Sequence, residues 1–267
     1  MARTEANRMF QHFSAVADVY RDMRTTDEAP ILLIRGALRG RKSLRAADIG
    51  CGAGRYDRLL FHHIPNLHLI CIDASAEMLA QLEDLLAGAD IRAFETLMSG
   101  VEELTLDAGS LDAVFTFNAV HHFNFPDFLA MVRPALAPDG RIFIYTRTPE
   151  QNAGSVWGHH FPDFCDKETR LYTLAQMTAW VGEADGLQLI GAEAFEYSRS
   201  ASLERLLEQA TNRHYSTFSL YGEEEFEIAC RGFADNVRRH FDDPNRIDWQ
   251  DANTLLHIGL APDAAAG

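Results

Sequence analysis

Basic residues are scarce in this chain of 267 residues. Lys and Arg total 24 against 39 Asp and Glu, which gives a formal net charge of −15. Proteins that bind polynucleotides draw much of their affinity from neutralised phosphates, and no basic cluster stands out along this sequence. We therefore expect no nucleic acid and no anionic membrane as a partner.

Paired cysteines and long apolar runs are also missing. The four cysteines are scattered and form no Cys-x-x-Cys pair, so neither a disulfide framework nor a metal site is expected; they are Cys51, Cys71, Cys165 and Cys230. No apolar run approaches the roughly 20 residues that span a bilayer. The first residues, "MARTEANRMFQHF", lack the apolar core of a signal peptide. These absences favour a cytoplasmic protein.

Short apolar runs alternate with longer amphipathic stretches from about residue 44 onward, a pattern typical of strand and helix units around a parallel sheet. Strands are predicted in "AADI", "LHLICI", "IRAFET", "DAVFTF" and "RIFIYT". The clearest helix is "SAEMLAQLEDLLAG", with Ser75 as N-cap and Gly88 as its C-terminal stop. "PALAPDGR" predicts the end of another helix and a turn before a strand that follows Gly140. We therefore predict an α/β core over residues 44–148.

The segments on either side of this core are less regular. Residues 1–43 contain amphipathic helical patterns, which we expect to cap the carboxyl edge of the sheet. After the core, "RTPEQNAGSVWGHHFPDF" is typical of a loop with a functional or interface role. A helix from Leu174 to Glu183, a strand in "LQLIGAEAFEYS", a helical insertion at about 200–240 and a final apolar run, "NTLLHIGLA", complete the chain. The last two strands indicate an antiparallel edge, and we predict a single domain over residues 1–267.

Three glycines follow the first predicted strand, in "DIGCGAGR". Gly50, Gly52 and Gly54 allow a tight turn and a close approach of the backbone to a ligand. A dinucleotide fingerprint needs a third glycine where this chain has Arg55, and the carboxylate of Asp48 would repel a pyrophosphate. The loop therefore suits a ligand that presents a cation or hydroxyl groups, with an ordinary glycine turn as the alternative.

An acidic residue ends the second predicted strand. Asp73 lies nineteen residues after Gly54 (73 − 54), where such folds place a carboxylate that accepts hydrogen bonds from both ribose hydroxyls. The alternative role, N-cap of the next helix, is better filled by Ser75. This spacing favours a ligand that contains a nucleoside.

Taken together, "DIGCGAGR", "IDASAEML" and "LDAVFTFNAVHHF" resemble the class I S-adenosylmethionine-dependent methyltransferases, in particular the small-molecule group called type 11 or UbiE-like. The resemblance covers about residues 46–146. It implies a Rossmann-like, mostly parallel sheet of seven strands with an antiparallel final strand and helices on both faces. It also implies an N-terminal helical cap over 1–43, a cofactor-binding core over 44–148, and an acceptor side over 149–267 whose helical insertion precedes the last strand.

The resemblance assigns cofactor contacts to the loops after the strands. The glycine loop with Asp48 lies against the methionine moiety, Asp73 holds the ribose, and Ala74 and Met78 lie beside the adenine. Asn118 lies near the methionine part, and two residues of the N-terminal cap approach the sulfonium and the carboxylate, unless they only form an exposed helix face. The implied set is Tyr20, Arg24, Asp48, Gly50, Cys51, Gly52, Gly54, Asp73, Ala74, Met78, Ser99, Gly100, Val101 and Asn118.

One position departs from the pattern of the family. Relatives usually carry an acidic residue before the "EEL" segment, where it accepts a hydrogen bond from the adenine amino group, and this chain has Gly100 there. The adenine is then expected to be read by the backbone of Gly100 and Val101, or by Ser99.

The acceptor side offers fewer signals. His121 and His122 follow the fourth strand, where a near-neutral imidazole can take a proton from a hydroxyl or thiol, so they are the candidate catalytic residues. Arg147 could pair with a substrate carboxylate. The predicted substrate-binding set is Tyr145, Arg147, Gln151, Trp157 and His160. For Trp157 the alternative is packing beneath the helical insertion.

The first functional hypothesis is methyl transfer from S-adenosylmethionine to a small molecule, with S-adenosylhomocysteine as the product and no metal. The acceptor atom is left open among oxygen, nitrogen, carbon and sulfur, and a monomer or homodimer is expected. One alternative is a protein of the same fold that binds the cofactor without transferring a methyl group. A nicotinamide-dependent oxidoreductase is disfavoured by Asp48 and Arg55.

Overall fold

The computed structural model describes residues 26–262 and divides them into two compact units. The sheet unit comprises residues 26–146, 172–195 and 254–262, and the helical unit comprises residues 147–171 and 196–253. The single domain expected for residues 1–267 stays a prediction. Within the described range, none of the helices combines the length and the apolar character that a membrane crossing requires.

The sheet has seven strands in the order β3-β2-β1-β4-β5-β7-β6. β1 to β4 pair in parallel with one another and with β5, whereas β7 runs antiparallel to β5. This arrangement confirms the predicted Rossmann-like sheet. The strand bounds are β1 Leu44–Ile49, β2 Leu67–Asp73, β3 Phe94–Met98, β4 Leu111–Phe117, β5 Leu136–Thr146, β6 Leu187–Ala201 and β7 Ile247–Leu260.

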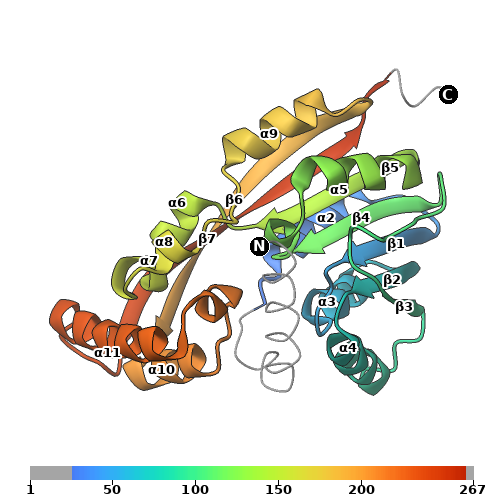
Figure 1. Ribbon diagram of the computed structural model, residues 1–267. Helices are drawn as coiled ribbons and strands as arrows, with labels where there is room; N and C mark the ends of the chain where they lie inside the picture. Colours follow the sequence, from blue (N-terminus) through green and yellow to red (C-terminus); the bar gives the residue numbers. More distant parts are fainter. Residues whose placement is uncertain (1–25, 263–267) are drawn as a thin grey trace. The chain divides into compact units, whose positions relative to one another are not determined.

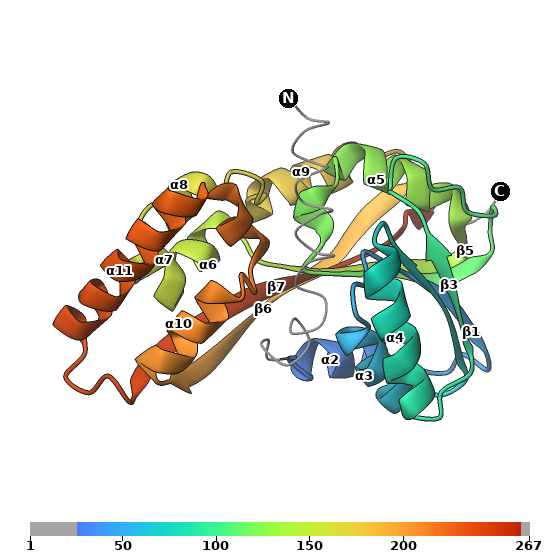
Figure 2. The same ribbon diagram turned by 60° about the horizontal axis from the view of Figure 1, so that its bottom comes forward.

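Helices cover both faces of the sheet in the sheet unit (Figures 1 and 2). On one face, apolar residues of α2, α3 and α4 pack against the strands, and on the other face those of α5 and α9 do so. The two clusters of buried side chains form one core on each face of the sheet. Because both faces are covered, a ligand-binding site is expected at the ends of the strands. The bounds are α2 Ala29–Ala37, α3 Arg55–His63, α4 Ala76–Gly88, η1 Val120–His122, α5 Phe125–Val132, η2 Arg133–Ala135 and α9 Leu174–Glu183.

The helix after β2 forms as its sequence predicts. The Ser75 hydroxyl accepts a hydrogen bond from the Met78 amide at 3.2 Å, which satisfies one amide at the helix start. Leu82 and Leu86 are buried on the inward face, and Gly88 is the last helical residue, one position before the C-cap Ala89. The predicted N-cap and apolar stripe are therefore confirmed.

The predicted starts of three strands are wrong, and one of them is that of β7, which begins at Ile247 rather than at Asn253. β3 begins at Phe94 rather than at Ile91, because the Ile91 amide donates to the Leu86 carbonyl and so closes the end of α4. β5 begins at Leu136, where a helix end and turn were expected. A shift in the β4–β5 register between Leu111 and Ala113 lets residues 136–140 continue the strand as an irregularity.

The helical unit is built around an aromatic core. The segment expected to be a loop forms α6 Pro149–Ala153, α7 Val156–His160 and α8 Phe164–Lys167, with Thr148 and Ser155 as N-caps of α6 and α7. The predicted insertion forms α10 Leu203–Thr211, η3 Ser216–Leu220 and α11 Glu223–His240. The Trp157 ring stacks on Phe233 with centroids 5.0 Å apart. Aromatic burial explains these short helices and agrees with the packing alternative given for Trp157.

Candidate functional site

The loops after β1 to β4 meet at one edge of the sheet, because the carboxyl ends of parallel strands lie together. Backbone hydrogen bonds fix these loops against neighbouring strands. The Gly50 amide donates to the Ile72 carbonyl at 2.8 Å, and the Ser99 amide donates to the Asp73 carbonyl at 3.1 Å. Asn118, with a φ of 54°, follows β4 at the same edge. Most of the predicted cofactor residues are therefore brought together.

Two glycines of the loop differ in what surrounds them. A Cβ on Gly50 would lie 2.5 Å from the Cβ of Ala119, so this glycine allows the loop to pack against the segment after β4. Gly52 has a φ of +55°, and no atom of residues 26–262 lies within 4 Å of a Cβ position there. Within this part of the chain no side chain blocks the backbone at Gly52, and the close approach of a ligand to the loop stays a prediction.

Asp73 ends β2 beside this open backbone. One carboxylate oxygen, Oδ2, accepts from the Gly52 amide at 2.9 Å, and the other, Oδ1, accepts from the Ser75 amide at 2.9 Å. Burial raises the pKa of Asp73, and the amides that donate to it lower that pKa. Each carboxylate oxygen has a further lone pair, so the group can accept two hydroxyl hydrogen bonds while the amides hold its orientation.

Asp48 lies under the glycine loop rather than on its surface. Its side chain is 1% exposed and faces Asp57, a residue of α3 that is 0% exposed. Burial is the main cause that raises the pKa of both groups, for Asp57 to about 7. The Cys71 thiol donates to Asp57 Oδ1 at 3.6 Å, whereas Asp48 Oδ1 and Asp57 Oδ2 meet no donor among the described residues. One proton shared between the two carboxyl groups gives them a hydrogen bond to each other and removes the need for two buried negative charges.

Sequence reasoning missed Asp57. A signal was present, because Asp57 lies three residues before Leu60 and therefore on the buried face of α3. An acidic residue on the apolar face of a helix next to a glycine loop indicates a partner in the core.

The other predicted cofactor residues vary in exposure. Ala74 is exposed, Cys51, Ser99 and Gly100 are half-buried, and Val101 packs partly against the core. Gly54 is the N-cap of α3, and a Cβ there would lie 2.8 Å from Leu82 Cγ. The Met78 side chain is 1% exposed and belongs to the interior of the sheet unit, which leaves little of it for an adenine. Tyr20 and Arg24 lie outside the described residues.

The two candidate catalytic histidines follow β4 in η1. The rings of His121 and His122 are 4.1 Å apart between centroids, and both side chains are half-buried. They lie after Asn118, at the carboxyl end of β4, and their role as proton acceptors stays a prediction.

Two of the predicted acceptor residues are buried by packing. Tyr145 is 0% exposed within the sheet unit, and its hydroxyl donates to Asp27 Oδ2 at 3.1 Å. Trp157 is 3% exposed within the core of the helical unit. Neither side chain offers surface to an acceptor in this structure, which corrects the placement of Tyr145 and Trp157 in the predicted substrate-binding set and supports the packing alternative for Trp157.

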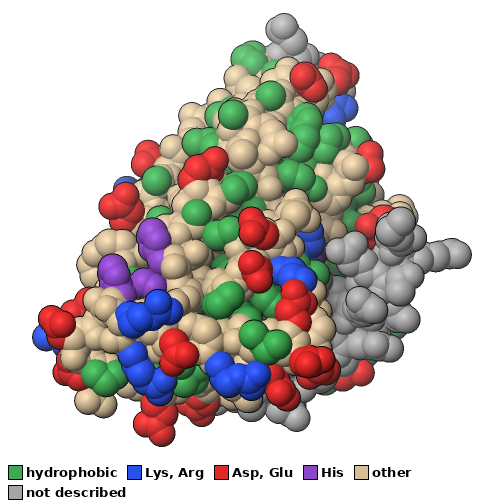
Figure 3. Space-filling model, turned by 60° about the vertical axis from the view of Figure 1, so that its left-hand side comes forward, with side chains coloured by type: hydrophobic (Ala, Val, Ile, Leu, Met, Phe, Trp, Pro, Cys, Tyr) green, Lys and Arg blue, Asp and Glu red, His purple; other side chains and the backbone are tan. Residues whose placement is uncertain are grey.

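The other three predicted substrate-binding residues, Arg147, Gln151 and His160, contact neighbours within the helical unit. Gln151 forms a capping box with Thr148 at the start of α6. Arg147 forms an ion pair with Asp251, whose second oxygen lies 4.0 Å from Arg199 Nε. The His160 ring lies 4.8 Å from that of His240 between centroids, and burial, followed by the charge of His240, lowers its pKa. Figure 3 shows histidines gathered beside basic side chains on one face.

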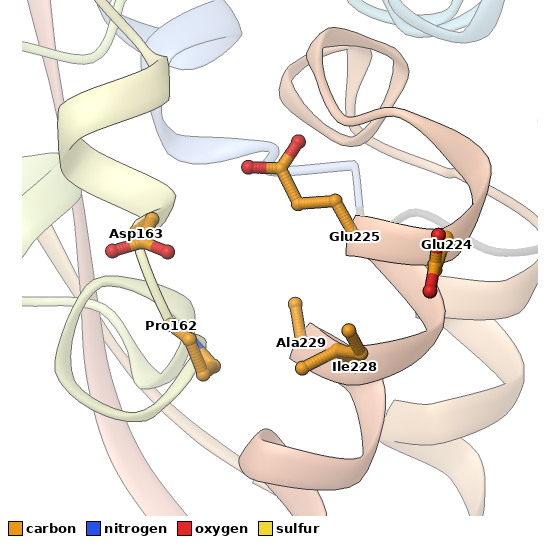
Figure 4. Close-up of a pocket in the computed structure, with 6 residues that line it drawn as sticks. All are labelled: Pro162, Asp163, Glu224, Glu225, Ile228 and Ala229. Atoms are coloured by element: carbon orange, nitrogen blue, oxygen red, sulfur yellow. The ribbon is translucent and has the colours of Figure 1, made fainter.

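A surface pocket of about 280 Å³ lies in the helical unit between the start of α8 and the first turns of α11 (Figure 4). Its rim carries three carboxylates over an apolar floor, and Glu225 is paired with Lys167 at 2.7 Å. The lining residues are Pro162, Asp163, Glu224, Glu225, Ile228 and Ala229. It shares no residue with the predicted site.

The comparison with protein families identifies the class of this site. The family model described as "Methyltransferase domain" matches residues 46–140, which contain the glycine loop, Asp73 and Asn118. Residues 46–140 therefore match a methyltransferase domain, in agreement with the resemblance of the same segment to the S-adenosylmethionine-dependent class I methyltransferases. No curated protein sequence matches the chain significantly.

Solved structures share the fold at low sequence identity. The cyclopropane synthase MmaA2 of Mycobacterium tuberculosis is 17% identical with a TM-score of 0.59, and the match covers 94% of this chain and 98% of that one. A Haemonchus contortus phosphoethanolamine N-methyltransferase, in complex with phosphomonomethylethanolamine and S-adenosylhomocysteine, is 18% identical with a TM-score of 0.54, over 87% of this chain and 52% of that one. Geranyl diphosphate methyltransferase in complex with S-adenosylmethionine is 12% identical with a TM-score of 0.54, over 87% and 84% of the two chains.

Proposed function

We propose that the protein transfers a methyl group from S-adenosylmethionine to a small-molecule acceptor by in-line displacement. The observation that carries this proposal is the Asp73 carboxylate, held by the Gly52 and Ser75 amides beside an open glycine backbone. This arrangement lies within the residues that match a methyltransferase domain. Two structures of the same fold contain S-adenosylhomocysteine or S-adenosylmethionine, which supports the same cofactor here.

The residues at the sheet edge fit such a cofactor. The two oxygens of Asp73 suit the two hydroxyls of a ribose, because both accept and are fixed in direction by backbone amides. The open surroundings of Gly52 leave room for a chain that passes along the loop. Asp48 and Asp57 lie beneath the loop. When either of these acids is ionised, its negative charge favours a ligand segment that carries positive charge.

The chain then has few chemical tasks. A bound sulfonium makes its methyl carbon electrophilic, so alignment and exclusion of water account for most of what the protein must supply. His121 and His122, at the end of β4, are the proposed proton acceptors for a hydroxyl or thiol acceptor. Both side chains are half-buried at that strand end.

A small acceptor is proposed rather than a macromolecule. The net charge of −15 disfavours polynucleotides. Among the structures that share the fold, one contains phosphomonomethylethanolamine and another is a geranyl diphosphate methyltransferase. Arg147 is the proposed partner of a substrate carboxylate, in competition with Asp251, which already pairs with it.

Native mass spectrometry of the purified protein tests the proposal. We expect adducts with the mass of S-adenosylmethionine or S-adenosylhomocysteine, and transfer of a deuterated methyl group from labelled cofactor to a component of a small-molecule extract. Cofactor binding with no labelled product in any extract would overturn methyl transfer in favour of a binding protein. A rise in melting temperature with a nicotinamide cofactor and none with S-adenosylmethionine would overturn the cofactor assignment.

A further inference from the structure

Two acids bracket the glycine loop. Asp48 lies near the end of β1, just before the loop, and Asp57 lies in the first turn of α3, just after it. Their side chains are 1% and 0% exposed and face each other. Among residues 26–262, no Lys, Arg or His pairs with either carboxyl group. The loop is therefore flanked at both ends by one buried pair of acids.

The surroundings of this pair make its ionisation costly. Asp48 Oδ1 and Asp57 Oδ2 meet no donor among the described residues, whereas Asp57 Oδ1 accepts from the Cys71 thiol at 3.6 Å. Two carboxylates that face each other away from water repel each other and lose their hydration, so the pair keeps at least one proton. Burial raises the pKa of both carboxyl groups, for Asp57 to about 7. The charge of the pair therefore changes near neutral pH.

The other titratable groups that act on the pair are thiols and a third acid. Cys51 lies in the loop and Cys71 on β2, and burial raises the pKa of both thiols, so neither carries a charge at neutral pH. Asp73, at the end of β2, raises the pKa of Asp48 and of Asp57 through its charge. The elements α2, α4 and β4 contribute apolar side chains to this core. A bound ligand can thus supply a positive charge that these residues do not.

The proposed cofactor and its product differ by one positive charge. S-adenosylmethionine carries a sulfonium, whereas S-adenosylhomocysteine carries a neutral thioether at the same sulfur, and the base, the ribose and the amino acid groups are unchanged. A cation at the loop stabilises the ionised form of the acid pair. By linkage, the same cation binds more tightly once the pair has lost its proton, whereas the neutral thioether gains much less.

We propose that Asp57, together with Asp48, makes the protein select the sulfonium cofactor over its thioether product, by releasing a proton to solvent when the cation binds at the glycine loop. This inference rests on the proposed function, because it presumes that S-adenosylmethionine binds along that loop. Asp57 acts through Asp48 and the loop as a specificity-determining residue. After methyl transfer the sulfonium charge is gone, so the pair takes up a proton again and the product is held more weakly.

Calorimetric titration with both ligands between pH 6 and pH 8 tests the inference. The affinity for S-adenosylmethionine relative to S-adenosylhomocysteine should rise about fivefold over this range in the wild type, and less than about twofold in Asp57→Asn. Titrations at pH 7 in two buffers of different ionisation enthalpy count the protons, and the wild type should release more of them with S-adenosylmethionine. The amino groups of the ligands titrate alike with both proteins, so their contribution cancels. Asp84→Asn removes an exposed acid of α4 and is the matched control, expected to behave as the wild type.

A second variant separates this linkage from an effect on folding. Asp48→Asn removes the other acid of the pair and is expected to abolish the same pH dependence, so either variant tests the inference if the other does not fold. A ratio of affinities that does not change with pH in the wild type, or that rises equally in Asp57→Asn, would overturn the inference while leaving the proposed function intact. Failure of the wild-type protein to bind either ligand would overturn both.

Discussion

The sheet unit and the helical unit differ in how their polar residues are used. In the sheet unit, Asp73 and the glycine loop project from strand ends, and backbone amides hold the carboxylate in place. In the helical unit, Gln151 caps a helix and Arg147 joins an ion pair. Ligands of doubly wound sheets bind beyond the carboxyl ends of the strands, so position at a strand end is a better guide to a candidate site than residue type alone.

The buried acids of the two units differ in their partners. Both units bury aromatic rings, Phe115 and Phe143 in the sheet unit and Trp157, Phe218 and Phe233 in the helical unit. The buried Glu168 of the helical unit pairs with Arg170, whereas in the sheet unit the carboxyl groups of Asp48 and Asp57 are buried against each other. The following predictions use these contrasts, from the largest expected effect to the smallest.

The largest effect is expected from truncating the centre of the aromatic core. Trp157→Ala should lower the free energy of unfolding by about 3–5 kcal/mol, because it removes a large buried ring and leaves a cavity. Urea denaturation measures this loss, with the partly buried Trp249→Ala as the control that loses less. A loss below about 1 kcal/mol would mean that Trp157 is not a packing residue and would return it to the acceptor site.

A pH-dependent effect is expected from the acidic pair of the sheet unit. Burial raises the pKa of Asp57 to about 7, whereas an unfolded aspartate titrates near 4. Between pH 4 and pH 7 Asp57 is protonated in the folded state and ionised in the unfolded state. Proton binding at Asp57 therefore stabilises the fold fully below pH 4, and this stabilisation is lost as pH rises through 7. Its size is on the order of a few kcal/mol.

Urea denaturation of the wild type and Asp57→Asn between pH 4.5 and 8 isolates this contribution. The wild type should lose more stability over this range than the variant. Burial lowers the pKa of His257 to about 4, so the contribution of this histidine to stability rises with pH. Because His257 is present in both proteins, its contribution cancels when the two pH profiles are subtracted. Parallel pH profiles of the two proteins would show that the pair does not hold the proton.

The smallest effect is expected from alanine substitutions at Gly50 and Gly52 of the glycine loop. Gly52→Ala places a Cβ in open space at a φ of +55° and should cost about 1 kcal/mol of stability while weakening S-adenosylhomocysteine binding. Gly50→Ala drives a Cβ against Ala119 and should cost more stability. Thermal denaturation and calorimetry measure the two quantities. Unchanged ligand affinity in Gly52→Ala would place the ligand elsewhere.

Much of the sheet unit was predictable because local and long-range signals agree there. The strands around the glycine loop are continuous apolar runs, and the Ser75 cap and the stripe of α4 follow simple spacing rules. The start of β3 was missed because Ile91 closes the preceding helix, and the start of β5 because a register shift extends the strand.

The rest depended on tertiary contacts that sequence spacing does not encode. The spacing of Asp57 from Leu60 places it on the buried face of α3, but the identity of its partner, Asp48, on another element could not be read from the sequence. Tyr145 and Trp157 were placed in the acceptor site by their position at and beyond the end of the fifth predicted strand, but their rings pack inward.

The most direct test of the central claim is the affinity of S-adenosylhomocysteine for Asp73→Ala, measured by calorimetry beside the wild type. Removal of both acceptor oxygens should weaken binding about 100-fold, while the protein stays folded. Asp112→Ala is the matched control. Asp112 lies at the start of β4, at the opposite end of the strand from the candidate site, and its carboxylate accepts from the Arg41 side chain and the Arg45 amide. Wild-type affinity in Asp73→Ala would contradict the account, since the ribose would then be held elsewhere.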